Sequence, residues 1–182
     1  MSGRPLESEY DPFYAGYVAL VPEQDILEAL TAQADAVSAP VLALPEERER
    51  SRYAPEKWTV REVLGHIGDA ERVFGYRAFC ISRLDDTPLP GFDEKPYVAH
   101  SGFSEVPVAE LVADFRRLRE SHAAFLRRVE RDRWEQKGIA NGSPISLRAL
   151  AYIMVGHVRH HMNVLRTRYG IGPRPAADET QH

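Results

Sequence analysis

The stretch "VGHVRHHMNVL", residues 155–165, sets three histidines, His157, His160 and His161, on about one turn of a predicted helix. Apolar residues around them recur at alternating spacings of three and four, which is typical of a helix with one face in a core. His157 and His161 fall on that apolar face, and His160 falls on its flank. Because residues four apart lie one above the other on a helix, the imidazoles of His157 and His161 can converge on one metal ion.

Three more segments have helical periodicity, and little of the chain is typical of strands. Thr59 and Glu62 have the spacing of a capping box at the start of the second helix, and Ser146 and Gly170 suit the two ends of the fourth. The predicted helices span residues 22–44, 60–83, 108–129 and 146–170. Four amphipathic helices in a chain of 182 residues predict an all-α fold, a four-helix bundle in a single domain.

The predicted core consists of the apolar seams of these helices. The seam of the first helix runs from Leu27 to Leu44. The seam of the third comprises Val108, Leu111, Phe115, Leu118, His122, Phe125 and Val129. His122 is therefore either a hydrogen-bonded core histidine or a residue behind the metal site.

The connections between the helices are unequal in length. "LDDTPLPGFDEKPYVAHSGFSEV", residues 84–106, is a long loop between helices 2 and 3, rich in proline and aromatic residues. We expect it to be an ordered lid over the metal, with Phe92 as its anchor. "DRWEQKGIANGSP", residues 132–144, contains an Asn-Gly turn signal and predicts a small hairpin. The expected domain organisation is an N-terminal arm packed on the bundle (1–21), the bundle (22–170) and a frayed C-terminal tail (171–182).

Composition excludes several classes of partner. A formal net charge of −4 provides no field to attract nucleic acid or an anionic membrane. The single cysteine, Cys80, excludes an internal disulfide and is typical of a reducing compartment. No signal peptide or membrane-spanning run is visible, so we expect a cytoplasmic protein.

A third histidine on a facing helix would favour a metal site over two hydrogen-bonded core histidines. The second helix supplies His66 in "EVLGHIGDAERVF". At about 100° per residue, His66 lies on the shoulder of that helix's apolar arc and not at its centre. Periodicity therefore leaves both interpretations open.

Three stretches resemble the DinB-like (DNA-damage-inducible) superfamily, which includes the bacillithiol and mycothiol transferases. They are "KWTVREVLGHIGDAERVFGYRAFCISR" (57–83), "PLPGFDE" (88–94) and "ALAYIMVGHVRHHMNVLR" (149–166), and the resemblance extends over roughly residues 20 to 170. By position, it implies that His66, His157 and His161 hold a divalent metal in a four-helix bundle that is often dimeric. It also implies that coordination positions stay open for water or substrate.

The implied function is metal-dependent transfer of a low-molecular-weight thiol to a small-molecule substrate, or a related addition or hydrolysis. Zinc, nickel and iron all suit imidazole ligands. The alternative is a non-catalytic, dimeric metal-binding protein of a stress response. A homodimer is also expected because Tyr76, Phe79 and Tyr152 lie off the main apolar seams, where we predict them to be exposed.

Other polar residues near the predicted site have less specific patterns. Asp69 and Glu62 lie about one turn either side of His66, where they can orient its ring or simply form a solvated helix face. Arg77 shares the shoulder of His66 and is a candidate for binding an anionic substrate.

Two related chemistries are excluded by single positions. Metalloproteases with the H-E-x-x-H motif need a glutamate after the first histidine, and this chain has Val158 there. Iron-dependent sulfoxide synthases carry a glutamate where this chain has Asn163. Cys80 is interpreted as packing on a buried helix face rather than as a nucleophile.

Overall fold

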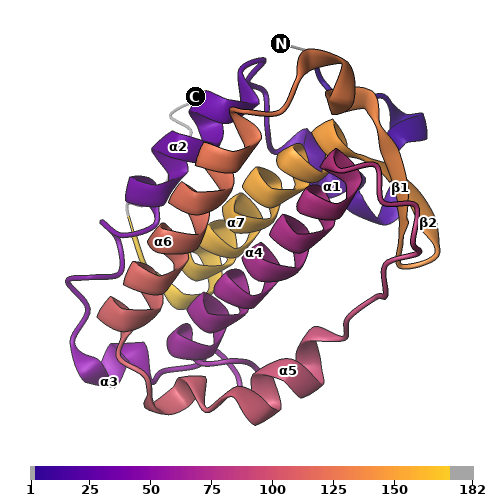
Figure 1. The fold of residues 1–182 in the computed structure, drawn as a ribbon. Coiled ribbons are helices and arrows are strands. Elements are labelled where there is room, and N and C mark those ends of the chain that lie inside the picture. The colour runs from indigo at the N-terminus through magenta and orange to yellow at the C-terminus, as the bar shows by residue number, and fades with distance from the viewer. Residues whose placement is uncertain (1–2, 173–182) are drawn as a thin grey trace, which may run out of the picture.

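A computed structural model of the chain describes residues 3–172 and contains a four-helix bundle, as the sequence predicts (Figure 1). The helix α4 packs against α6 and α7, and α2 packs against the same two helices. The four bundle helices are α2 (Ile26–Ala36), α4 (Val60–Ser82), α6 (Val108–Leu126) and α7 (Leu147–Tyr169).

Shorter elements surround the bundle. The Asn141-Gly142 pair forms the predicted hairpin turn, and both residues have positive φ angles, 52° and 77°, as a type I′ turn requires. The shorter elements are η1 (Glu7–Glu9), η2 (Pro12–Tyr14), α1 (Ala15–Ala19), α3 (Glu46–Glu49), α5 (Glu94–Ser101), η3 (Phe103–Glu105), η4 (Arg131–Glu135), β1 (Lys137–Ala140) and β2 (Ser143–Ser146).

The predicted caps fix the ends of two bundle helices. The Thr59 side chain accepts a hydrogen bond from Glu62 N, and the Glu62 carboxylate accepts one from Thr59 N, which completes the capping box of α4. Ser146 Oγ accepts from Ala149 N at the start of α7. Gly170 follows the end of α7 with a φ of 66°, the left-handed conformation that glycine favours.

The first bundle helix is shorter than the predicted span of 22–44. It begins at Ile26, where the Asp25 side chain caps the first turn, and it ends at Ala36. Pro40 explains the early end, because it has no N–H to donate to the Ala36 carbonyl and its ring would clash with that carbonyl. The chain continues in turns in which Val41 is still buried, so the apolar spacing looks continuous in sequence.

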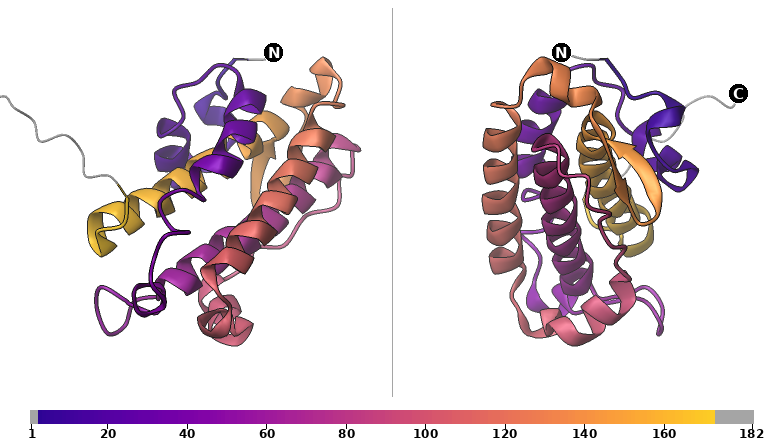
Figure 2. Two further views of the ribbon diagram at one scale, coloured as in Figure 1. Left: turned by 90° about the vertical axis from the view of Figure 1, so that its left-hand side faces the viewer. Right: turned by 45° about the vertical axis from the view of Figure 1, so that its right-hand side comes forward.

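The long connection between α4 and α6, residues 83–107, is a crossover segment. Figures 1 and 2 show it returning along the bundle, so that α4 and α6 run in the same direction and α5 lies across one end. Parallel neighbours need such a long connection. Leu89 extends the hairpin, because its N–H donates to Ile139 O (2.8 Å) and its carbonyl accepts from Asn141 N (3.0 Å). The segment is therefore held in place by backbone hydrogen bonds.

A buried charged network joins all four bundle helices. Arg119 of α6 is fully buried and donates to both carboxylate oxygens of Glu71 on α4, at 3.0 and 2.7 Å. It also donates to the Gln33 side chain of α2 (2.7 Å) and to the Met154 carbonyl of α7 (3.2 Å). Burial alone would raise the pKa of Glu71, but Arg119 and His122 lower it below its usual value, so the carboxylate stays ionised.

This network corrects the predicted seam of the third helix. Beyond Phe115 the buried residues are Arg119, Ala123 and Leu126, whereas Leu118 and Phe125 are only half-buried. The physical reason is that the charge of Arg119 is neutralised inside the bundle, so it replaces an apolar residue in the core. A pattern that counts apolar residues alone misses it.

The N-terminal arm, residues 3–21, packs along α7. Glu9 is buried and accepts hydrogen bonds from Ser146 Oγ and Arg148 Nε, both at 2.7 Å. Burial opposes ionisation, but Arg148 and these hydrogen bonds lower the pKa of Glu9 to about 2. The arm also contacts α7 at Gly156, where an added Cβ would lie only 2.0 Å from the Tyr17 carbonyl oxygen.

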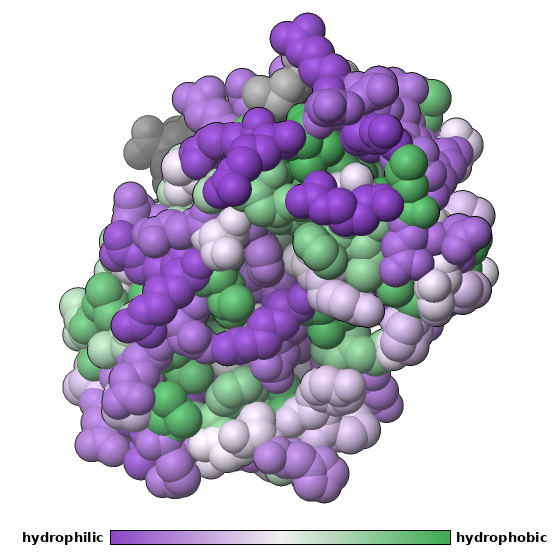
Figure 3. Space-filling model, viewed as in Figure 1, coloured by the Kyte–Doolittle hydropathy of each residue, from purple (hydrophilic) through white to green (hydrophobic). Residues whose placement is uncertain are grey.

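The surface departs from expectation at one aromatic residue. Tyr76 and Phe79 are exposed by 59% and 50%, as predicted, but Tyr152 is fully buried, and its hydroxyl donates to Glu23 O (2.9 Å). Tyr152 is buried because the N-terminal arm covers that side of α7. Figure 3 shows apolar residues in small separate areas on one face. The homodimer stays a prediction.

Two further features concern the described residues 3–172. None of their helices combines the length and apolar character that crossing a bilayer requires. Of the tail predicted at 171–182, Ile171 is buried and donates its N–H to Leu165 O (3.1 Å), and residues 173–182 lie outside the described residues.

The contact between Gly156 and Tyr17 predicts a specific effect on stability. Gly156→Ala should lower the free energy of unfolding by about 1–3 kcal/mol, because the new methyl group must push the arm away from α7. Gly16→Ala is the matched control, since nothing lies within 4 Å of the added Cβ and alanine favours the helix. Urea unfolding of both variants checks this, and equal effects would contradict it.

Candidate metal centre

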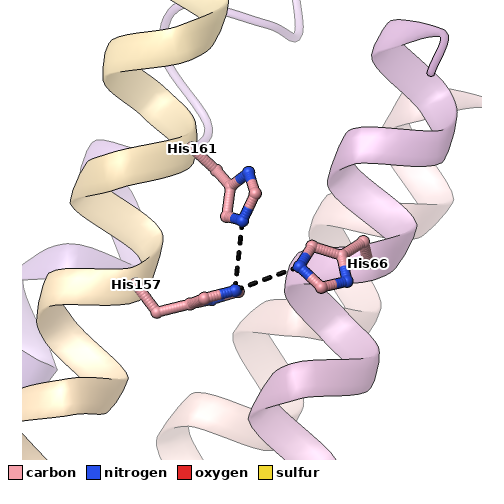
Figure 4. A group of neighbouring side chains, drawn as sticks. All are labelled: His66, His157 and His161. Atoms are coloured by element: carbon pink, nitrogen blue, oxygen red, sulfur yellow. Dashed lines mark hydrogen bonds between the residues drawn. The ribbon is translucent and has the colours of Figure 1, made fainter. Parts of the chain in front are cut away.

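Three histidines from two bundle helices face one another in the structure (Figure 4). His66 comes from α4, and His157 and His161 come from successive turns of α7. His157 Nε2 lies 3.0 Å from His66 Nε2 and 3.1 Å from His161 Nε2. All three ligand atoms lie within 4.8 Å of one another. The close packing of α4 on α7 therefore brings together the residues that the sequence pattern selects.

The nitrogen contacts fit a metal better than a set of hydrogen bonds. A neutral imidazole nitrogen either carries one proton or offers one lone pair. His157 Nε2 has two nitrogen neighbours, so no placement of protons gives it a good hydrogen bond to both. A cation between the rings would use all three lone pairs, and separations near 3 Å suit metal–nitrogen bonds of about 2.0–2.1 Å.

Burial keeps these histidines in the neutral form that binds metals. Burial lowers the pKa of His66 to about 4, although the carboxylate of Glu94 acts in the opposite direction. Burial and the neighbouring His161 and His66 rings hold the pKa of His157 well below its usual value. Burial, with His66 and His160 nearby, does the same for His161. Protons therefore compete weakly for the three nitrogens at neutral pH.

Aromatic rings surround the histidine cluster. The centroid of the Trp58 ring lies 4.9 Å from that of His66. Tyr17 and Phe74 lie 5.5 and 5.7 Å from His157, both edge-on. Such rings restrict the access of water and fix the orientation of the imidazoles.

A pocket of about 330 Å³ adjoins the three histidines, a size that is typical of small-molecule sites. Its walls come from parts of the chain that are far apart in sequence. Besides the bundle helices, it is lined by Phe13, Tyr14 and Tyr17 of the arm, Phe92 and Glu94 of the crossover segment, and Asn141 of the hairpin. The crossover segment thus lies over the histidine site, as the lid hypothesis expects.

The other sequence candidates lie outside the cluster. His160 is exposed at the rim of the pocket, with its ring 5.0 Å from that of His161. His122 Nδ1 lies 2.9 Å from Glu71 Oε1, so His122 belongs to the buried charged network. Glu62 caps its own helix, and the carboxylate of Asp69 lies 3.5 Å from Arg72. The structure gives no contact between Glu62 or Asp69 and His66.

Arg77 and Cys80 are both buried on α4. Arg77 lines the pocket and donates to the Pro90 carbonyl (2.7 Å). Cys80 is packed in the core and is no part of the pocket, in agreement with its interpretation as a packing residue.

Sequence reasoning missed several residues around the site. The position of Phe74 could be predicted from the sequence, since it lies two turns beyond His66 on the same face of α4. Trp58 and Glu94 carry no periodic signal, because they lie in segments whose course depends on the fold.

Comparisons with known proteins identify the family and the fold. The sequence profile of the DinB superfamily matches residues 29–165, which contain all three histidines. No curated protein matches the chain. Among solved structures, YfiT from Bacillus subtilis, described as a probable metal-dependent hydrolase with an unusual four-helix bundle topology, is similar in fold. Its TM-score is 0.74 at 20% sequence identity, over 90% of this chain and 95% of that chain. The chain therefore belongs to the DinB superfamily.

Proposed function

We propose that this protein is a metal-dependent enzyme that transfers a low-molecular-weight thiol to a small-molecule substrate. His66, His157 and His161 would hold the divalent metal. The observation that carries the proposal is the convergence of three neutral imidazoles, those of His66 and His157 buried and that of His161 partly buried, beside a pocket of small-molecule size. Zinc, nickel and iron all fit this donor set.

The metal would supply Lewis acidity, which favours the deprotonated form of a thiol or water substrate. Three neutral ligands leave the charge of the ion uncompensated. Within the described residues the candidate ligand group contains only these three side chains, so we expect coordination positions of the metal to stay open. This supports the enzyme over the alternative, a non-catalytic metal-binding protein, in which a fourth protein ligand would be expected.

The chain's own residues supply the remaining functions. Glu94 lines the pocket, and we expect its carboxylate to accept a proton from a bound substrate. Tyr17, Trp58 and Phe74 exclude water around the histidines and offer apolar surface to a substrate. Hydrolysis, with water in place of the thiol, is the second candidate, because YfiT is described as a probable hydrolase.

The metal assignment is tested by single substitutions in the full chain. His66→Ala, His157→Ala and His161→Ala should each lose stoichiometric metal, because two remaining imidazoles bind an ion weakly. His160→Ala is the matched control and should keep about one ion per chain, since His160 lies at the rim. Metal analysis of protein purified without added metal measures this, and equal loss in all four variants would disprove the ligand set.

The same samples distinguish the two reactions. Metal-loaded protein should consume bacillithiol, mycothiol or glutathione in the presence of an aromatic electrophile, and His161→Ala should not. Activity on an activated ester without any thiol would instead favour hydrolysis. A metal-loaded protein that is inactive in both assays would favour the non-catalytic alternative.

The free energy of unfolding of the metal-free protein should decrease as the pH is lowered from about 6.5 to about 4. In this range the unfolded chain protonates its histidines, whereas folded His66 stays neutral down to a pKa of about 4. Each such histidine therefore costs about 1.4 kcal/mol per pH unit as the pH falls. The free energy of unfolding, measured with urea at several pH values, should depend less steeply on pH in His66→Ala, by about that amount per pH unit. An identical pH dependence in the variant and the wild type would contradict the expectation.

Removal of Phe92 tests whether the crossover segment acts as a lid. Phe92→Ala should retain metal but lower the affinity of metal-loaded protein for benzyl mercaptan by about tenfold, because a ring that lines the pocket is lost. Phe103→Ala, in the same segment but outside this pocket, is the control for general destabilisation. If both variants only lower the melting temperature, the segment is scaffolding.

A further inference from the structure

Arg77 differs from the other buried arginines in lacking a carboxylate partner. Arg61, Arg119 and Arg148 are buried, and each pairs with a glutamate, namely Glu49, Glu71 and Glu9. Arg77 is only 3% exposed, yet none of the carboxylates in residues 3–172 lies within ion-pair distance of it. Its guanidinium donates a hydrogen bond to a neutral acceptor, the Pro90 carbonyl. A buried charge without a counter-ion is costly, which points to an anion supplied from outside.

The position of Arg77 on α4 relates it directly to the histidine site. His66, Ala70, Phe74 and Arg77 follow one another at spacings of four, four and three, and all four line the same pocket. Arg77 comes eleven residues after His66, which brings it back to nearly the same face about 16 Å further along the helix axis. The guanidinium carbon also lies 5.9 Å from the Phe74 ring centroid.

The polarity of the pocket wall therefore changes along its length. The wall has histidines at one end, small and aromatic apolar side chains in the middle, and a positive charge at the other end. The remaining N–H groups of a guanidinium suit a carboxylate or a phosphate, which accept in the same plane.

We propose that Arg77 binds an anionic group of the substrate. The substrate would then be a small anion whose negative group is separated by an apolar portion from the atom that reacts beside the histidines. The link to the reacting atom rests on the proposed function above, whereas the anion site can be tested by itself.

An experiment must distinguish anion binding in this pocket from two other roles of Arg77. Arg77 could simply hold the crossover segment through the Pro90 carbonyl. It also borders a second hollow, which is lined by α4 and that segment and includes Arg72. The Arg72 guanidinium already forms an ion pair with Asp114. Arg72 therefore provides a nearby positive charge as a control for Arg77.

The test compares two probes that differ only in charge, 3-phenylpropionate and its amide, 3-phenylpropanamide. Binding is measured by calorimetry on full-length protein as purified and after removal of metal, because a carboxylate could also bind the ion. The variants are Arg77→Gln, Arg77→Lys and the control Arg72→Gln, each first checked for an unchanged melting temperature or corrected for the folded fraction. Shifts of the histidine ring signals in NMR spectra report whether the probe occupies this pocket.

The acid should bind wild type about tenfold more tightly than the amide, with or without metal, and should shift the His66 and His157 signals. In Arg77→Gln the ratio should fall to about one while the amide affinity stays similar, and Arg77→Lys should keep part of the preference. Arg72→Gln should leave the ratio unchanged.

Three results would overturn the proposal. The first is a wild type that does not prefer the acid, and the second is a preference that survives Arg77→Gln. The third is an Arg72→Gln effect equal to that of Arg77→Gln, which would place the anion in the second hollow, beside Arg72. Equal loss of both probes in Arg77→Gln would show that Arg77 only holds the crossover segment. If metal binding fails but the preference persists, the proposed function is wrong and the anion site stands.

Discussion

The hydrogen bonds of the Arg119 guanidinium fix the arrangement on which the rest of the structure depends. They reach Glu71 on α4, Gln33 on α2 and the Met154 carbonyl on α7, so one side chain of α6 contacts the other three bundle helices. A buried charge tolerates little displacement, because any sliding of one helix would leave it unpaired. Gln33 adds a hydrogen bond to the Val155 carbonyl (2.9 Å), two residues before His157. The axial position of α7 relative to α4, and hence the distance from His157 to His66, follows from this network.

The apolar core of the bundle alone would not fix the relative positions of the polar groups in the site. Three uncharged imidazoles close together and an unpaired guanidinium all oppose folding. Ion pairs elsewhere, such as Glu9 with Arg148 and Glu49 with Arg61, attach the arm to α7 and α3 to α4. The unfavourable free energy of burying polar groups therefore arises mainly in one pocket. The groups responsible, imidazoles and a guanidinium, are also groups able to bind ligands.

Sequence patterns predict the parts of this molecule that depend on local rules. The capping box of Thr59 and Glu62, the Asn-Gly turn and the spacing of His157 and His161 each follow from geometry within a few residues. The end of α2 was missed because the burial of Val41 continues the apolar spacing past Pro40. The burial of Arg119 and Tyr152 was missed because it depends on partners far away in sequence, Glu71 in one case and the N-terminal arm in the other. The placement of Trp58 and Glu94 beside the histidines likewise depends on the complete fold.

The arm that packs on α7 has a consequence for how such a protein can diversify. Phe13, Tyr14 and Tyr17 form one wall of the pocket, yet they lie outside residues 29–165, the region of this chain that matches the superfamily profile. The bundle that carries the three histidines and part of the wall of the adjoining pocket are thus encoded in separate stretches of the chain. Exchange of a short N-terminal stretch could retune selectivity while leaving the histidines and their supporting network untouched.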